Sequence, residues 1–295
     1  MTPVVAPGVR RITCANPGPM THTGTQSYLI ACGADAVALV DPGPEDAAHR
    51  EAVLLALVPG ERIAAILVTH SHRDHSAGAP ALAAATGAPV LAFGPHGAGM
   101  SATMRALAEA GGIGGGEGAD RGFRPDRQLG DAELIEIGGR GIRALHTPGH
   151  ISNHLCFALE GEGVLFTGDT AMGWSTTLVS PPDGDMAAFM ETLRRLARRD
   201  DRLYLPGHGE PVKDPAGLLA RQIAHREARA AQAIEALREG PGDVRALAPR
   251  IYRDIAPELL PAAERNLLAT LIWLSEEGRV EALGPIRADT RFRLP

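Results

Sequence analysis

Three histidines and an aspartate lie within six consecutive residues, and together they could bind metal ions. They are His70, His72, Asp74 and His75, and they follow an apolar run. Neutral imidazole and carboxylate groups are ligands that zinc prefers and that iron and manganese also accept. Alternate side chains of an extended segment point to the same side, so His70 and His72 would face one centre. The turn that follows can bring Asp74 and His75 around a second centre.

Three more potential ligands each end an apolar run farther along the chain. His150 ends TPGH, Asp169 ends VLFTGD and His208 ends LPGH. Each follows a glycine, where the backbone can approach closely and turn sharply. Together with the first motif they predict a centre for two Zn²⁺ ions, with iron or manganese as alternatives. Two cations that share a water lower its pKa, so that hydroxide can attack a carbonyl carbon or a phosphorus near neutral pH. Asp74 would both bind metal and orient this nucleophile.

His154 stands four residues after His150 and has two interpretations. It either braces a neighbouring ligand through a hydrogen bond, or it faces the substrate and gives a proton to the leaving group. Both interpretations stay open at this point.

Trp174, Thr176 and Thr177 follow Asp169 in a glycine-led polar stretch, and we predict that they form part of the pocket wall. A tryptophan there could stack on a base or an acyl group, or it could instead fill the core. The isolated histidines are interpreted as incidental: His22, His49, His96, His146 and His225.

Short apolar runs separated by glycine turns predict the strands that position these residues. Strands are expected over 27–33, 36–43, 63–70, 89–93 and 203–209, and a series of short strands is expected within 133–169. Helices are expected over 44–57, 77–85 and 186–198. Two halves, each with strands and then helices, indicate an α+β fold, an αββα sandwich with two sheets inside and helices outside. The glycine-rich residues 111–122 predict a surface loop, with a role as a lid or with none.

The sequence pattern changes after residue 214, where longer helical segments replace the short strands. A long helix over 217–239 is followed by a short helix capped by Asp243 and a third helix from Pro261. The end of the chain, TRFRLP, could return as the second strand of a hairpin. Helices followed by a hairpin make a winged-helix-like shape. We therefore predict a hydrolase domain over 1–214 and a C-terminal winged-helix-like domain over 215–295.

Composition and charge limit the function classes. The formal net charge of -6 argues against a general nucleic-acid coat. The three cysteines form neither a CxxC pair nor a disulfide framework, which favours a reducing compartment. The N-terminus lacks a signal pattern, and no apolar run is long enough to span a bilayer. We expect a cytoplasmic protein without a membrane partner, and the pattern leaves the oligomeric state open.

The HxHxDH motif at residues 70–75 resembles the metallo-β-lactamase superfamily over about the first 215 residues. The resemblance implies that His70, His72 and His150 hold one metal, that Asp74, His75 and His208 hold the other, and that Asp169 bridges both. A bridging aspartate is typical of the superfamily's thioesterases, lactonases and phosphodiesterases. True β-lactamases lack it, so the resemblance implies at most a weak β-lactamase side activity.

Nearly the whole chain resembles the lactamase-β-like protein 2 group, which has a C-terminal winged-helix-like domain. The similar segments are NPGPMTHTGTQSYLI, LYLPGHGEPVKDP, IAHREAR and AAERNLLATLIWLSEEGRV. An animal member is described as an endoribonuclease on single-stranded RNA. The main hypothesis from the sequence is therefore a two-metal phosphodiesterase acting on single-stranded RNA. The alternatives are a glyoxalase II-like hydrolase of small thioesters, esters or lactones, and a nucleic-acid-binding module with structural metals.

Overall fold

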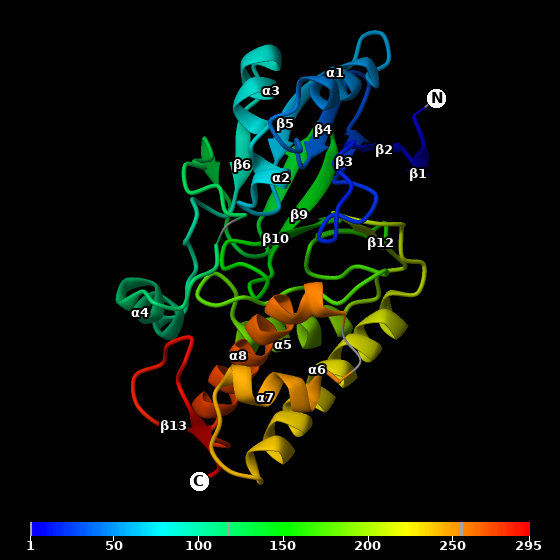
Figure 1. Ribbon diagram of the computed structural model, residues 1–295. Helices are drawn as coiled ribbons and strands as arrows, with labels where there is room; N and C mark the ends of the chain where they lie inside the picture. Colours follow the sequence, from blue (N-terminus) through cyan, green and yellow to red (C-terminus); the bar gives the residue numbers. More distant parts are fainter. Residues whose placement is uncertain (1, 117, 254–255) are drawn as a thin grey trace.

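The computed structural model describes residues 2–116, 118–253 and 256–295, and its core is built around two β-sheets (Figure 1). The first sheet contains, in spatial order, β1 (Val4–Ala6), β2 (Val9–Thr13), β3 (Gln26–Ala31), β4 (Ala36–Val40), β5 (Arg62–Leu67), β6 (Val90–Ala92) and β7 (Arg127–Gln128). Strands β1 to β4 pair antiparallel, and β4 to β7 pair in parallel. The predicted hairpin is confirmed as β3 and β4, with Tyr28 opposite Val40.

The second sheet is formed by the later strands of the same part of the chain. Its order is β12 (Leu203–Pro206), β11 (Val164–Gly168), β10 (Leu155–Leu159), β9 (Arg140–His146) and β8 (Leu134–Ile137). All pairs are antiparallel except β11 with β12. The two sheets face each other across a core that includes Ile30, Leu67, Phe157 and Phe166. Alternating inward side chains of both sheets fill this layer and exclude water from it.

Helices cover the outer faces of both sheets. Helices α1 (Ala47–Leu55) and α3 (Ala79–Thr86) pack on the first sheet through Val53 and Leu82. The Asp46 side chain accepts from the His49 amide and so begins α1. Helix α5 (Met186–Ala197) packs on the second sheet through Phe189 and Leu193. The predicted αββα sandwich is confirmed.

The C-terminal part contains α6 (Pro215–Leu237), α7 (Val244–Ile251), the 3₁₀ turn η1 (Pro257–Leu259), α8 (Leu260–Glu276), β13 (Glu281–Ala282) and β14 (Phe292–Arg293). Strands β13 and β14 pair antiparallel as the wing. Asp243 caps α7 by accepting from the Ala246 amide, as predicted. One hydrophobic core joins Leu165 of β11, Phe189 of α5 and Leu271 of α8. The division at residue 215 stays a prediction, since the core is continuous across it.

Two short helices were not predicted: α2 (Arg73–Ser76) and α4 (Ala102–Ala110). The glycine-rich stretch that follows α4 lies partly against the protein, because Ile113 is 5% exposed and its carbonyl accepts from Arg265. Residue 117 of that stretch lies outside the described residues. In the described ranges, no helix has the length and apolar character needed to cross a bilayer. The cysteines are buried free thiols. The cytoplasmic location stays a prediction.

Candidate metal centre

The seven predicted ligands meet at one end of the two sheets. His70 follows β5, Asp169 follows β11 and His208 follows β12. Because β11 and β12 run in parallel, their carboxyl ends lie side by side, and the Gly207 amide donates to the Gly168 carbonyl there. His150 comes from the loop between β9 and β10. The sequence separations are long, yet the strand ends bring the side chains together.

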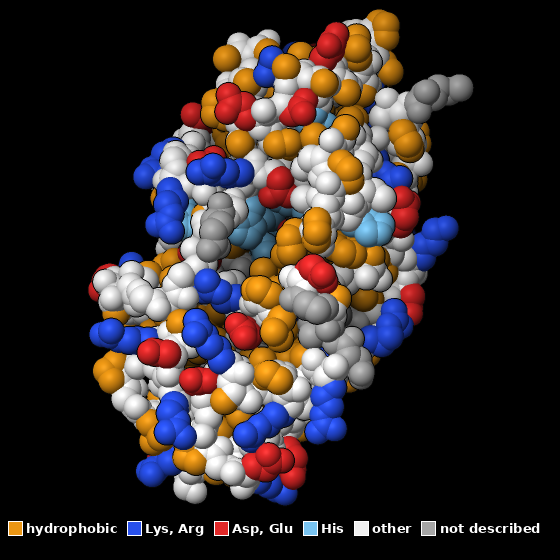
Figure 2. Space-filling model, in the orientation of Figure 1, with side chains coloured by type: hydrophobic (Ala, Val, Ile, Leu, Met, Phe, Trp, Pro, Cys, Tyr) orange, Lys and Arg blue, Asp and Glu red, His pale blue; other side chains and the backbone are white. Residues whose placement is uncertain are grey.

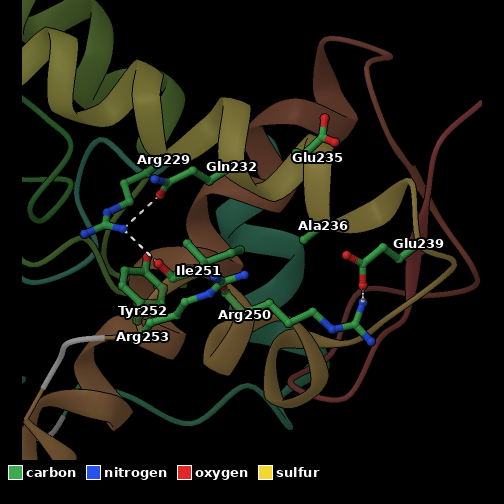
Figure 3. A pocket seen from close by; sticks show the side chains of 9 residues that line it. All are labelled: Arg229, Gln232, Glu235, Ala236, Glu239, Arg250, Ile251, Tyr252 and Arg253. Atoms are coloured by element: carbon green, nitrogen blue, oxygen red, sulfur yellow. Dashed lines mark hydrogen bonds and ion pairs between the residues drawn. The ribbon is translucent and has the colours of Figure 1, made fainter.

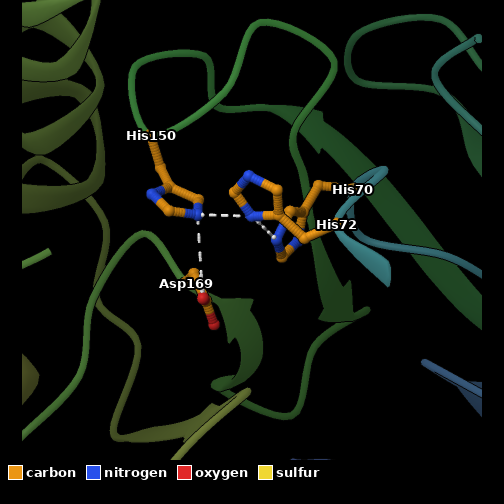
Figure 4. A group of neighbouring side chains, drawn as sticks. All are labelled: His70, His72, His150 and Asp169. Atoms are coloured by element: carbon orange, nitrogen blue, oxygen red, sulfur yellow. Dashed lines mark hydrogen bonds and ion pairs between the residues drawn. The ribbon is translucent and has the colours of Figure 1, made fainter. Parts of the chain in front are cut away.

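His70, His72, His150 and Asp169 form the first group, in which every ligand atom lies within 4.8 Å of the others (Figure 4). The His72 Nδ1 atom lies 2.9 Å from His70 Nε2 and 3.0 Å from His150 Nε2. The Asp169 Oδ2 atom lies 3.7 Å from His150 Nε2. In tetrahedral zinc sites, ligand nitrogens are about 3.3 Å apart, because each lies about 2 Å from the metal. The group therefore has the spacing of a single-metal ligand set.

Asp74, His75 and His208 form the second group, which obeys the same 4.8 Å limit. The Nε2 atoms of His75 and His208 are 3.2 Å apart. The Asp74 Oδ2 atom lies 3.3 Å from His75 Nε2 and 3.2 Å from His208 Nε2.

Asp169 stands between the two groups. Its Oδ1 atom lies 3.4 Å from His75 Nε2, and its Oδ2 atom lies 3.4 Å from His208 Nε2. Gly207 permits this approach, because a Cβ atom there would stand 2.5 Å from Asp169 Oδ1. This is the division of ligands that the resemblance implied. The ligand roles themselves stay a prediction.

Each histidine ring except that of His72 is oriented by a hydrogen bond at Nδ1, which leaves Nε2 toward the centre. The Nδ1 atom of His150 donates to the Leu178 carbonyl (2.7 Å), and that of His208 to the Gly24 carbonyl (3.2 Å). The Nδ1 atom of His70 lies 2.9 Å from Thr69 Oγ1. Partners of this kind fix the tautomer of metal-binding histidines.

Asp41 is a site residue that the sequence reasoning missed. It directly follows β4, is 2% exposed, and its Oδ2 atom accepts from His75 Nδ1 (2.9 Å) and Thr69 Oγ1 (2.8 Å). Its Oδ1 atom accepts from the Thr69 amide (2.7 Å). Its signal in the sequence was an aspartate that ends a predicted buried strand before a Pro-Gly turn. In the structure this aspartate has a positive φ of 52°. One carboxylate thus braces His75 directly and His70 through Thr69.

The charges at the site suit cations. Burial lowers the pKa of His72 to about 3, with His150 adding to the effect, so this ring is neutral at pH 7 and can act as a ligand. Burial also lowers the pKa values of His70 and His150. Burial would lower the pKa of His208 as well, but the carboxylates of Asp169 and Asp74 outweigh it and raise the pKa to about 9. The second group therefore favours positive charge at its centre.

A buried atom also points to a missing partner. Asp169 Oδ1 is buried and accepts no hydrogen bond of normal geometry from the described residues, although His75 Nε2 lies 3.4 Å away. Uncompensated buried carboxylate oxygens are costly, whereas a metal cation would satisfy this one. Spacing, donor chemistry and this orphaned oxygen agree, so the residues fit a two-metal centre.

His154 lies behind the ligands and away from the cavity. It is fully buried, its Nε2 atom accepts from the Asp169 amide (3.2 Å), and its Nδ1 atom lies 2.8 Å from Thr147 Oγ1. Its ring stacks on that of His70 with centroids 5.0 Å apart. The proton-donor interpretation is therefore wrong, because both ring nitrogens are engaged inside the protein. The geometry agrees with the bracing interpretation.

The candidate centre opens into a cavity of about 680 Å³ between the sandwich and the C-terminal helices. Figure 2 shows a hollow in this face with histidine side chains at its bottom. Trp174 and Thr176 line the cavity, and their contact with a substrate stays a prediction. Thr177 was wrongly placed in the wall: it is 1% exposed, and its hydroxyl donates to the Asp169 carbonyl (2.6 Å). It holds the backbone of a predicted ligand instead.

Two other predictions change at this cavity. His225, interpreted as incidental, is part of its lining. Gly116 and Gly118 of the glycine-rich stretch also line it, and the Gly118 carbonyl accepts from the Arg73 amide (2.9 Å). This stretch therefore contributes to the wall of the cavity.

Comparisons with known proteins agree with the two-part architecture. Residues 20–208 match the metallo-beta-lactamase superfamily, and residues 244–286 match the beta-lactamase associated winged helix domain. A crystal structure of a beta-lactamase domain protein from Burkholderia ambifaria is similar over 100% of this chain and 93% of that one, with 26% identity and a TM-score of 0.82. A metallo-beta-lactamase family protein from Thermus thermophilus is similar over 99% of this chain and 100% of that one, with 26% identity and a TM-score of 0.77.

Curated relatives include enzymes named for a reaction. An atrochrysone carboxyl ACP thioesterase of Aspergillus fumigatus is 30% identical over 79% of this chain and 66% of the relative. The lactamase-like protein adaB of Aspergillus niger is 32% identical over 78% of this chain and 63% of the relative. The chain thus spans about two thirds of the length of these relatives.

Proposed function

Since the chain belongs to the metallo-beta-lactamase superfamily and is a metal-binding hydrolase, we propose that it hydrolyses thioesters at the seven-residue centre. The observation that carries this proposal is the 30% identity, over 79% of the chain, to a protein named as an ACP thioesterase. These comparisons favour the thioester alternative over single-stranded RNA, which was the main hypothesis from the sequence.

The cavity suits an acyl substrate. Apolar side chains dominate the wall near the predicted ligands, among them Met20, Met172, Trp174 and Leu178. An apolar wall with a few polar groups at one end is the usual form of a small-molecule site. A thioester carbonyl could approach the ligand groups while its acyl part contacts this wall.

Hydrolysis adds water across the C–S bond: a C–O bond forms, the C–S bond breaks, and the proton goes to the departing thiolate. We propose that His70, His72 and His150 hold one metal, that Asp74, His75 and His208 hold the other, and that Asp169 contacts both. When bound, two such cations supply a water of lowered pKa and polarise a substrate carbonyl. We expect Zn²⁺, with iron or manganese as alternatives.

We propose that Asp74 orients the attacking water. Its side chain is 28% exposed and lines the cavity, whereas that of Asp169 is 10% exposed. Its Oδ2 atom accepts from Thr25 Oγ1 at 3.1 Å, which fixes the carboxylate. A carboxylate that is held on one side and open to the cavity on the other can accept a hydrogen bond from water.

The experiment compares substrate classes on the metal-loaded protein. Purified protein is incubated with acyl-N-acetylcysteamine and acyl-CoA thioesters, and thiol release is followed with a chromogenic reagent. We expect hydrolysis that stops with a chelator and returns when metal is restored. Asp74→Ala should abolish it while circular dichroism shows the native fold.

A labelled single-stranded oligoribonucleotide and a chromogenic β-lactam form the other arms of the experiment. Cleavage of the RNA without hydrolysis of any thioester would refute the proposal and restore the hypothesis from the sequence. Full thioesterase activity in Asp74→Ala would refute the role given to Asp74.

A further inference from the structure

A buried arginine faces the cavity without an acidic partner. Arg226 of α6 is 4% exposed and lines the cavity that holds the predicted ligands. Its guanidinium donates to the Thr177 carbonyl and to Asn266 Oδ1 (3.0 Å), while its Nε atom is buried without a described hydrogen-bond partner. Burial lowers its pKa to about 10, so it remains a cation at neutral pH. Burying such a charge is costly unless something compensates it.

Two more arginines line the same cavity, and their described hydrogen bonds also go only to neutral oxygens. Arg229 donates to the Ile251 carbonyl (3.1 Å) and to Gln232 Oε1 (2.8 Å). Its guanidinium lies over the ring of Tyr252, 4.6 Å from the centroid. Arg265 donates to the Ile113 carbonyl (2.8 Å). Within the described ranges, no carboxylate pairs with Arg226, Arg229 or Arg265.

Other arginines of the chain do have such partners. Arg140 lies 2.6 Å from Glu162, and Arg250 of α7 lies 3.0 Å from Glu239 in the turn after α6. Arginines without a described ion pair also occur elsewhere, such as Arg73 and Arg202, but those are exposed to solvent, whereas Arg226 is buried. Neutral oxygens and an aromatic face orient the cavity arginines, but no acidic side chain in the described part of the chain neutralises them.

The acidic residues that line the cavity form no ion pair with these arginines in the described ranges. Asp74 and Asp169 belong to the predicted ligand groups. Asp183 lies beside His96, with 3.4 Å between its Oδ1 atom and His96 Nε2. The C-terminal helices α6 and α8 thus supply the arginines of the wall, whereas the sandwich part of the chain supplies its carboxylates.

We propose that Arg226, Arg229 and Arg265 form a binding subsite for an anionic group of the substrate. This inference rests on the proposed thioesterase function and narrows its substrate to thioesters that carry a phosphate or a carboxylate. Guanidinium groups bind both anions through paired N–H donors. The subsite lies in the same cavity as the catalytic end, so one substrate can reach both. The C-terminal helices would then select the substrate.

A second cavity provides a matched control. It has about 630 Å³ and is lined by residues of α6, the turn after α6, α7 and the segment after α7 (Figure 3). Arg229 and Tyr252 line both cavities, whereas Arg250 lines only this one. Arg250 is paired with Glu239. Arg250→Gln removes the same charge from the same helical part but leaves the first cavity intact.

The test uses pairs of substrates on the metal-loaded, full-length protein. One pair compares succinyl- with butyryl-N-acetylcysteamine, which differ in a carboxylate on the acyl part. The other compares butyryl-phosphopantetheine with butyryl-pantetheine, which differ in a phosphate on the thiol part. For each pair, kcat/KM of the anionic member is divided by kcat/KM of the neutral member. A change that affects catalysis in general cancels in this ratio.

Arg229→Gln and Arg265→Gln should each lower the ratio on the order of ten- to a hundred-fold, since each removes a charge-assisted contact. Arg250→Gln should leave it unchanged. The pair that responds identifies the position of the anion on the substrate. Unchanged ratios for both pairs in both variants would overturn the subsite. Absence of thioester hydrolysis in the wild type would instead refute the proposed function.

Binding supplies a readout that does not depend on turnover. Isothermal titration calorimetry would compare phosphopantetheine with pantetheine, neither of which has an acyl group to hydrolyse. If the phosphate occupies the subsite, the wild type binds phosphopantetheine more tightly, and Arg265→Gln loses that preference. A preference that persists unchanged in both Arg265→Gln and Arg229→Gln would assign the phosphate to another place.

Discussion

Replacing Asp41 with asparagine removes a negative charge beneath the candidate metal centre without changing the side-chain volume. In the wild type, Oδ2 accepts from His75 Nδ1 and from Thr69 Oγ1, and Oδ1 accepts from the Thr69 amide. An amide has only one oxygen. In either orientation of asparagine, at least one buried donor therefore faces an NH₂ group.

The expected size of the effect follows from these contacts. A buried donor left without an acceptor costs about 1–3 kcal/mol of unfolding free energy. The His75 ring also loses the partner that keeps its Nε2 atom toward Asp74 and His208. Loss of such a partner weakens metal binding by roughly 10- to 100-fold. We expect this loss at the ion held by the second ligand group.

The assay is a competition titration of metal-free protein with Zn²⁺ and a chromophoric chelator, together with the bound metal content after dialysis. Asp46→Asn is the matched control, because Asp46 caps α1 nearby without contacting a predicted ligand. If Asp41→Asn binds two ions per chain with wild-type affinities, Asp41 does not orient His75 and the reasoning is wrong.

Two further predictions concern the loop that carries His150 and the core shared with the C-terminal helices. Gly149→Ala should lower kcat/KM by about 100-fold, since a Cβ atom would stand 2.4 Å from the Phe189 Cα atom and displace His150. The control is Gly161→Ala, because Gly161 also has a positive φ (74°) but no atom lies within 4 Å of the added Cβ atom, so this variant should keep its activity. Wild-type kinetics in Gly149→Ala would contradict the prediction. Leu271→Ala, at a fully buried position in the shared core, should cost about 2–5 kcal/mol in one cooperative urea transition. A separate early transition, with the rest of the chain unaffected, would show that the C-terminal part unfolds independently.

Much of the fold could be predicted from local patterns. The apolar run before His70 predicts a buried strand in any context, and the largely buried β5 stands there. Asp243 was expected to cap a helix because a short side chain can accept from the third following amide, and it does so in α7. Helix α4 carries comparable local signals that the sequence reasoning did not use: the Ser101 side chain accepts from the Met104 amide and caps it, and Gly111 ends it.

The sequence by itself determined the residue types of the candidate site and their places after strands and in turns. Motif chemistry is local: the segment from His70 to His75 carries its signal within six residues. Strand ends were enough to propose His150, Asp169 and His208. The same local evidence could not separate RNA from a thioester, because both are attacked by the same nucleophile.

Only the tertiary structure decided which side chains stand behind the site and which face the substrate. Asp41 and His75 are 34 positions apart, and Thr177 and Arg226 are 49 apart, so no local pattern connects them. Burial reassigned His154 and Thr177 from the cavity to the support of Asp169. The physical reason is that side-chain exposure depends on how distant elements pack. The sandwich and the C-terminal helices create the cavity together, and its arginine-lined wall exists only after α6 and α8 have packed against the sandwich.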